Sequence, residues 1–116
     1  MKIFMKPETV VQHQLEAYNA RDLQRFIAVY SDQIKVFRPP ALEPAITGRS
    51  AFAEYYATQR FNRPNLRAEV LKRIVLGNKV IDYERIFGVH EQPLELVMVY
   101  QVADGLIQTV WLFSAE

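Results

Sequence analysis

The segment from Asp82 to Phe87 holds the ionisable residues whose spacing most clearly suggests chemistry. We predict that it is a strand, in which alternate side chains point to opposite faces. Asp82 and Glu84 therefore share one face, and Arg85 lies on the other. If the first face lines an apolar interior, the two carboxylates are acid/base candidates with raised pKa values. If the second face does so, Arg85 is placed to bind an anionic oxygen.

Arg38 is a second candidate for an anion site, because it could converge with Arg85 on a carboxylate, an enolate or another oxygen-rich ligand. The alternative is that one or both arginines pair with internal carboxylates such as Glu69 or Glu84, or extend to solvent. His13 could act as a base. However, it fits poorly to the apolar stripe of its predicted helix, which favours exposure. No residue is assigned a catalytic role from the sequence.

Composition excludes several classes of function. The chain of 116 residues has 14 basic and 13 acidic residues, and this near-balance gives no field that would attract nucleic acid or a membrane. It has no cysteine and two histidines, so no disulfide or thiolate site exists and we expect no metal site. Arg60, Arg63 and Arg67 are interpreted as solvated loop charges. Neither a signal peptide nor a membrane span is predicted, and we expect a cytoplasmic protein with residues 1–116 as one domain.

Helical and extended patterns follow one another along the chain. Apolar residues recur at helical spacing after Pro7, again after a predicted N-cap at Asp22, and between residues 50 and 60. A short strand is predicted at 34–38, followed by a loop at 41–48. Four extended runs then fill residues 66–113, with the first hairpin turning at Gly77-Asn78. Helices that precede an antiparallel meander predict an α+β fold.

At these residues the chain resembles the NTF2-like superfamily, and within it the SnoaL-like and steroid delta-isomerase-like domain proteins. The resemblance covers nearly the whole chain and implies a cone, in which three N-terminal helices pack on a curved, mostly antiparallel β-sheet. It also implies a homodimer, and we expect no cofactor. The residues on which the resemblance rests are at helix ends, turns and core positions, namely Val10–Leu23, Tyr30–Asp32, Gly48-Arg49 and Tyr100–Ile107.

The resemblance does not extend to the catalytic residues of two enzyme types within the superfamily. Steroid isomerases use a phenol, a carboxylate base and a protonated acid, and these positions fall on Gln14, Arg38 and Met98. An arginine stays protonated and cannot serve as that base. Limonene-epoxide hydrolases use two aspartates and an arginine, of which only the arginine remains, as Arg85.

The same resemblance predicts which side chains line the cone. It turns Tyr83, Arg85 and Phe87 inward on one strand and Met98 and Tyr100 inward on the next. A register shifted by one residue would instead turn Asp82 and Glu84 inward. The predicted pocket-lining residues are Gln14, Tyr18, Arg38, Tyr56, Tyr83, Arg85, Phe87, Met98 and Tyr100.

The sequence therefore predicts a domain that binds a small hydrophobic, oxygen-bearing molecule, as an isomerase, cyclase or hydrolase if it is an enzyme. The alternative is a non-enzymatic dimerisation or scaffold module whose interior is filled with side chains. An empty cavity favours the first function and a packed interior the second. We expect the homodimer to form through the outer face of the sheet, where Val97, Val99, Trp111 and Phe113 would otherwise form an exposed apolar patch.

Overall fold

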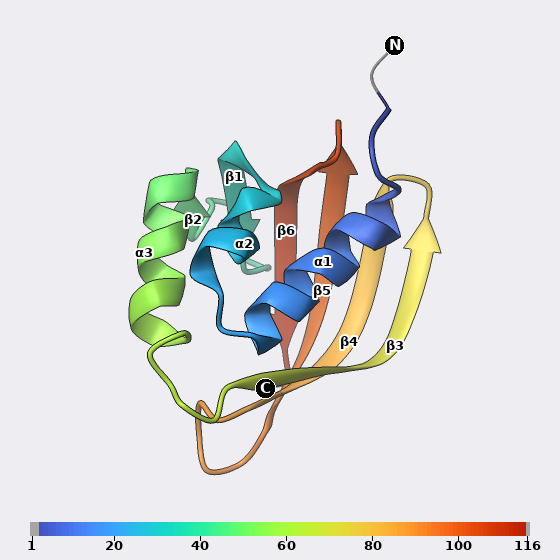
Figure 1. Cartoon of the computed structure of the whole chain (residues 1–116). Coiled ribbons are helices and arrows are strands. Elements are labelled where there is room, and N and C mark those ends of the chain that lie inside the picture. The colour runs from blue at the N-terminus through green and yellow to red at the C-terminus, as the bar shows by residue number, and fades with distance from the viewer. Residues whose placement is uncertain (1–2, 116) are drawn as a thin grey trace.

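The computed structural model describes residues 3–115, which form three helices packed on one face of a six-stranded sheet (Figure 1). The sheet is curved but does not close, and the helices cover its concave side. This is the α+β cone that the sequence predicts. In chain order the elements are α1 (Pro7–Asn19), α2 (Leu23–Ala28), β1 (Tyr30–Phe37), β2 (Ile46–Thr47), α3 (Arg49–Gln59), β3 (Arg67–Leu76), β4 (Lys79–Phe87), β5 (Leu94–Ala103) and β6 (Leu106–Ser114).

Local sequence accounts for the helix boundaries. Pro7 opens α1, where its missing N–H leaves nothing unpaired. Asp22 is the N-cap of α2, and its side chain accepts a hydrogen bond of 3.2 Å from the backbone N–H of Arg25. Gly48 precedes α3 with φ = +90°, a backbone conformation that favours glycine. Although β1 and β2 separate them in the chain, α2 and α3 pack against each other and against β1.

The strands lie in the order β2-β1-β6-β5-β4-β3, and all neighbours are antiparallel except β1 and β6. The first strand begins at Tyr30, four residues before the predicted start, because Tyr30 already pairs with Ile107 of β6. The predicted loop at 41–48 contains the two residues of β2, which pair with β1. The sheet is thus mixed and mostly antiparallel.

An aromatic cluster joins the helices to the sheet. Phe26 of α2 lies at its centre, with the ring centroids of its neighbours 4.8 to 5.7 Å away. Each such pair contributes about 0.5–1.5 kcal/mol beyond the burial of its area. The cluster therefore holds α2 and α3 firmly at the wide end of the cone. Its other members are Tyr18, Tyr30, Phe52, Tyr56 and Phe61.

Asn19 fixes the end of α1 to the start of β3. Its side-chain amide donates to the carbonyl of Ala68 at 3.0 Å and accepts from the N–H of Ala68 at 2.7 Å. β3 is the edge strand of the sheet, and this pair of hydrogen bonds satisfies the N–H and the carbonyl of Ala68, which no further strand pairs with on that side. Nearby, Gly88 has φ = +89°, and a Cβ there would collide with the backbone of Asn65. Both contacts set where β3 and β4 run relative to α1.

The predicted orientation of β4 is wrong by one residue. Asp82 lies opposite Met98 and Glu84 opposite Leu96, and opposed residues of an antiparallel pair share a face. Met98 points inward, as predicted, so Asp82 and Glu84 do too; they are 0% and 5% exposed. Tyr83, Arg85 and Phe87 consequently lie on the convex face, and Tyr83 is 38% exposed.

On β6 the predicted alternation is confirmed, because Leu112 is buried and Phe113 is exposed. No helix within residues 3–115 has the length and apolar character that crossing a lipid bilayer requires.

Candidate functional site

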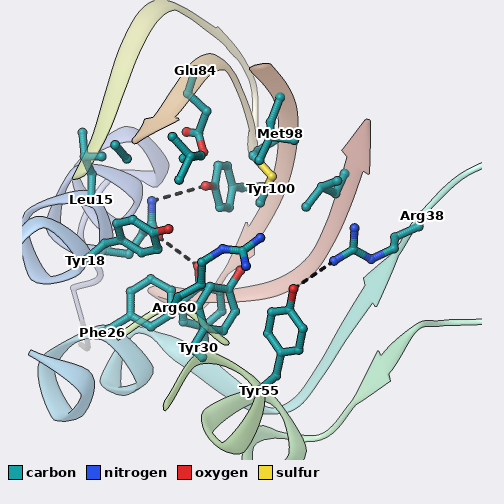
Figure 2. A pocket seen from close by; sticks show the side chains of 16 residues that line it. Leu15, Tyr18, Phe26, Tyr30, Arg38, Tyr55, Arg60, Glu84, Met98 and Tyr100 are labelled. Atoms are coloured by element: carbon teal, nitrogen blue, oxygen red, sulfur yellow. Dashed lines mark hydrogen bonds between the residues drawn. The ribbon is translucent and has the colours of Figure 1, made fainter. Parts of the chain in front are cut away.

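A cavity lies between the helices and the concave face of the sheet (Figure 2). Its enclosed space is about 30 Å³, room for about one water molecule, and the wider hollow of about 480 Å³ includes open solvent at its mouth. The inner part is narrow, so a ligand there must be slender or flat. Its walls come from all three helices and from the sheet: Gln14 and Tyr18 from α1, Phe26 from α2, Tyr55 from α3, and Glu84 and Met98 from the sheet. The interior is therefore almost filled by side chains, and most of the open space lies toward the mouth.

Six of the nine predicted pocket residues surround this cavity, and three do not. The three are Tyr83, Arg85 and Phe87, which the one-residue error on β4 had turned inward. Arg85 instead lies opposite Glu95 on the convex face, and the Tyr83 hydroxyl is hydrogen-bonded to Glu95. The six around the cavity are Gln14, Tyr18, Arg38, Tyr56, Met98 and Tyr100.

A short chain of hydrogen bonds centres on Gln14 at the inner end of the cavity. The hydroxyl of Tyr30 donates to Gln14 Oε1 at 3.0 Å, and Gln14 Nε2 donates to the hydroxyl oxygen of Tyr100 at 3.3 Å. All three side chains are buried. Because Tyr100 is the acceptor in this chain, its own hydroxyl proton remains available to an oxygen inside the cavity.

Glu84 is the one carboxylate among the described residues that line the cavity. Figure 2 shows its carboxylate pointing from β4 into the space between Tyr18 and Tyr100. No group in residues 3–115 donates a hydrogen bond to it, and its oxygens keep some accessible surface in the cavity. Burial, together with the negative charge of Asp82, raises the pKa of Glu84 to about 8, and Arg73 partly offsets the rise. Near neutral pH this group therefore exchanges readily between acid and base forms.

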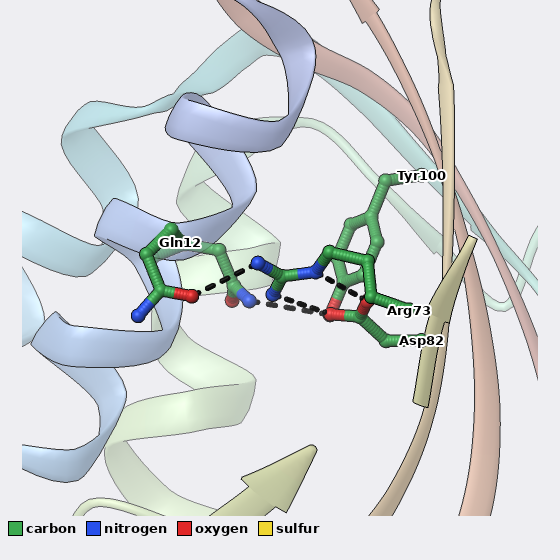
Figure 3. Close-up of polar contacts among 5 residues, drawn as sticks. Gln12, Arg73, Asp82 and Tyr100 are labelled. Atoms are coloured by element: carbon green, nitrogen blue, oxygen red, sulfur yellow. Dashed lines mark hydrogen bonds and ion pairs between the residues drawn. The ribbon is translucent and has the colours of Figure 1, made fainter. Parts of the chain in front are cut away.

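Asp82, two residues before Glu84, is fully buried but paired (Figure 3). Arg73 of β3 binds both of its carboxylate oxygens, through Nε at 2.7 Å and Nη2 at 2.9 Å. The same guanidinium donates to Gln12 Oε1 of α1 at 2.9 Å. The hydrogen bonds to Asp82 raise the pKa of Arg73, which stays cationic. Asp82 is thus committed to a structural ion pair, whereas Glu84 is not.

The tyrosines of the cavity are neutral hydrogen-bonding groups. Burial is the largest cause that raises the pKa of Tyr18, Tyr30, Tyr56 and Tyr100 above the ordinary value. A neutral phenol can donate to an oxygen that becomes negative during a reaction. The cavity therefore combines one titrating carboxylate with several fixed donors, on walls that are otherwise apolar.

The mouth carries two arginines. Arg38, which directly follows β1, donates through Nη2 to the hydroxyl of Tyr55 at 3.5 Å, and does not pair with Glu69 or Glu84. Arg60, at the end of α3, places its guanidinium 5.8 Å from the centroid of the same ring. The interpretation of Arg60 as a solvated loop charge was wrong, because the chain turns back after α3 and aims this side chain at the cavity.

Tyr30 matches a position where steroid isomerases carry a supporting tyrosine, but from the sequence we favoured a core aromatic; the structure shows it buried and hydrogen-bonded to Gln14 in the site. No set of three metal-binding side chains gathers anywhere in residues 3–115. The signal that would have placed Glu84 lies in the Gly77-Asn78 turn. A two-residue hairpin there puts Arg73 directly opposite Asp82 and so predicts a buried ion pair on the inner face.

Solved structures share this fold at low sequence identity. A protein from Kribbella flavida assigned as a ketosteroid isomerase superposes with a TM-score of 0.81 at 20% identity, over 95% of this chain and 78% of its own. An NTF2-like protein of unknown function from Cytophaga hutchinsonii gives 0.81 at 14%, over 99% and 95%. A protein from Sinorhizobium meliloti assigned as a polyketide cyclase gives 0.77 at 17%, over 93% and 99%.

No curated protein matches the sequence closely enough to count as a relative. The SnoaL-like domain family, in contrast, matches residues 11–110, which include all three helices but for the first residues of α1, and the sheet as far as the middle of β6. The match spans well over half of the chain and agrees with the fold. The chain therefore belongs to the SnoaL-like domain family, within the NTF2-like fold.

Proposed function

We propose that this chain binds a small hydrophobic carbonyl compound in the cavity and moves a proton on it, with Glu84 as the acid/base group. The position of Glu84 carries the proposal, since an unpaired carboxylate is costly to bury unless function retains it. A scaffold module would gain nothing from such a group. The open mouth of the hollow next to it gives a small ligand access to this group, which supports ligand binding.

In the proposed reaction, ionised Glu84 takes a proton from the carbon next to the carbonyl. The electron pair moves onto the carbonyl oxygen, which becomes an enolate and accepts hydrogen bonds from Tyr100 and Gln14. Protonated Glu84 then returns the proton to the same carbon or to a conjugated one. Return to a conjugated carbon isomerises the compound with no net change in its atoms. A pKa of about 8 keeps both forms of Glu84 accessible.

Two structural neighbours support this class of chemistry by their assignments, ketosteroid isomerase and polyketide cyclase. At 20% and 17% identity they share only the fold with this chain. The carboxylate proposed here stands on β4, whereas the steroid-isomerase alignment puts its base at Arg38. The substrate we propose is also smaller than a steroid, because the inner cavity is narrow.

Deuterium exchange tests the proposal without knowledge of the natural substrate. Acetophenone in D₂O should exchange its methyl protons faster with the protein than in buffer, as followed by proton NMR. Glu84→Gln should remove about 10²-fold or more of that catalysis. The rate should rise with pH and level off above about 8, where Glu84 is ionised.

Glu54→Gln, which changes an exposed glutamate on α3, is the matched control and should exchange like the wild type. Equal exchange by the wild type and Glu84→Gln, or none above buffer, would refute the role given to Glu84.

A further inference from the structure

The mouth of the cavity has a composition that the proposed proton transfer does not use. Arg38 and Arg60 reach it from different elements, and Tyr55 lies between them. Figure 2 shows both guanidinium groups on the same side of the cavity as Tyr55, away from Glu84. Arg60 also lies beside the Tyr18 hydroxyl and lowers the pKa that burial raises there. Arg60 therefore extends from the surface toward the interior.

These two cations have no carboxylate partner within residues 3–115. The ion pairs formed by arginines there join other residues, and Arg38 and Arg60 donate only to a hydroxyl or to the Gln59 carbonyl. Two guanidinium groups that converge without a counter-ion repel each other, and an anion between them relieves that repulsion. Arginine also matches the two oxygens of a carboxylate in geometry.

The interior end of the cavity has the opposite preference. Glu84 and the nearby Asp82 would repel a second carboxylate, and the cavity walls also include apolar side chains such as Phe26 and Met98. A ligand with one acidic group is thus held in one orientation. Its acid group lies at the mouth, and its uncharged oxygen lies inside, next to Gln14 and Tyr100.

We infer that the ligand is a small, flat keto acid, whose carboxylate is bound by Arg38 and Arg60 while its carbonyl group reaches Glu84. This inference rests on the proposed function for the role of Glu84, but the anion site stands on its own contacts. It names a substrate class narrower than hydrophobic carbonyl compounds in general. The arginines act in binding and orientation, and they take no part in proton transfer.

The test compares 4-acetylbenzoate with its methyl ester, which has the same ketone but no charge. Binding is measured by NMR titration, and melting temperatures establish that each variant is folded. The wild type should bind the acid at least about tenfold more tightly than the ester. Arg38→Gln and Arg60→Gln should each remove about tenfold of affinity for the acid and leave the ester unchanged. Arg85→Gln is the matched control, because Arg85 lies on the convex face.

Several outcomes would overturn the inference. Equal affinity of the wild type for the acid and the ester would do so. A preference for the acid that remains when both arginines are replaced would also do so, and so would a preference that Arg85→Gln removes. Failure of the anion site can be distinguished from failure of the proposed proton transfer. Deuterium exchange that depends on Glu84 but is equal for acid and ester would refute only the anion site. Arginine-dependent binding of the acid without exchange would refute only the proton transfer.

Discussion

Replacing Glu84 by glutamine should stabilise the protein, and increasingly so as the pH rises. The folded-state pKa of Glu84 is about 8 and its ordinary value is 4.5, because burial and Asp82 disfavour the charged form. The unfolded chain therefore ionises at lower pH than the folded one. The wild type retains its full stability below about pH 4.5 and loses stability between about 4.5 and 8. Above that range the loss is complete and constant.

The size of the effect follows from the two pKa values. Within this window each pH unit costs the wild type about 1.4 kcal/mol of unfolding free energy. The difference between pH 4 and pH 9 then approaches about 4–5 kcal/mol as an upper bound, since local relaxation or entry of water would reduce it. Glutamine has nearly the same shape and no charge, so the variant avoids this loss.

Urea denaturation of both proteins at pH values from 4 to 9 measures the difference directly. The gap between Glu84→Gln and wild type should widen with pH up to about 8 and then stay constant. Glu54→Gln, at an exposed position, reports the general effect of losing one carboxylate. A gap that does not change with pH would refute the burial of Glu84, and with it the inward orientation of β4.

Three further predictions concern the ion pair, the convex face and the substrate. Arg73→Leu should destabilise the fold by about 3 kcal/mol, because it leaves the buried Asp82 carboxylate unpaired, and adding Asp82→Leu should recover most of the loss in thermal unfolding. We propose that two copies associate through the convex face; Val99→Asp should then yield monomers by sedimentation velocity, and a wild type that sediments as a monomer at micromolar concentration would contradict this. A Δ5-3-ketosteroid should not be isomerised above the buffer rate in a spectrophotometric assay, since the inner cavity is too narrow for it; turnover that Glu84→Gln abolishes would show otherwise.

Most of the architecture could be predicted because most elements, β2 excepted, have a local signal. Pro7 and Asp22 mark helix starts, and the Gly77-Asn78 turn marks the first hairpin. The faces of β5 and β6 were also predictable, because the resemblance to the superfamily indicates which of their residues turn inward. These signals depend on residues close in sequence, and long-range packing reinforces them.

The face of β4 was not predictable from hydrophobicity. Its inner face holds Asp82 and Glu84, whereas Tyr83 and Phe87 are on the convex side, which inverts the usual burial preference. Burial of Asp82 is possible only because Arg73 approaches from β3, and burial of Glu84 only because its pKa rises. The role of Arg60 depends on the chain path after α3, which no local pattern specifies. Function-bearing positions are those where local rules are expected to fail.

The parallel pairing of β1 with β6 has a consequence for protein synthesis. On the ribosome, Val36 is made roughly seventy residues before Val110, its partner across the two strands. Until β6 emerges, β1 has only the two residues of β2 beside it, and its apolar side chains have no complete sheet to join. The three helices and β1 must therefore wait in an incomplete state, in which exposed strand edges invite aggregation and chaperone binding. β1 therefore gains its longer neighbour in the sheet only after β6, the last strand, has been made.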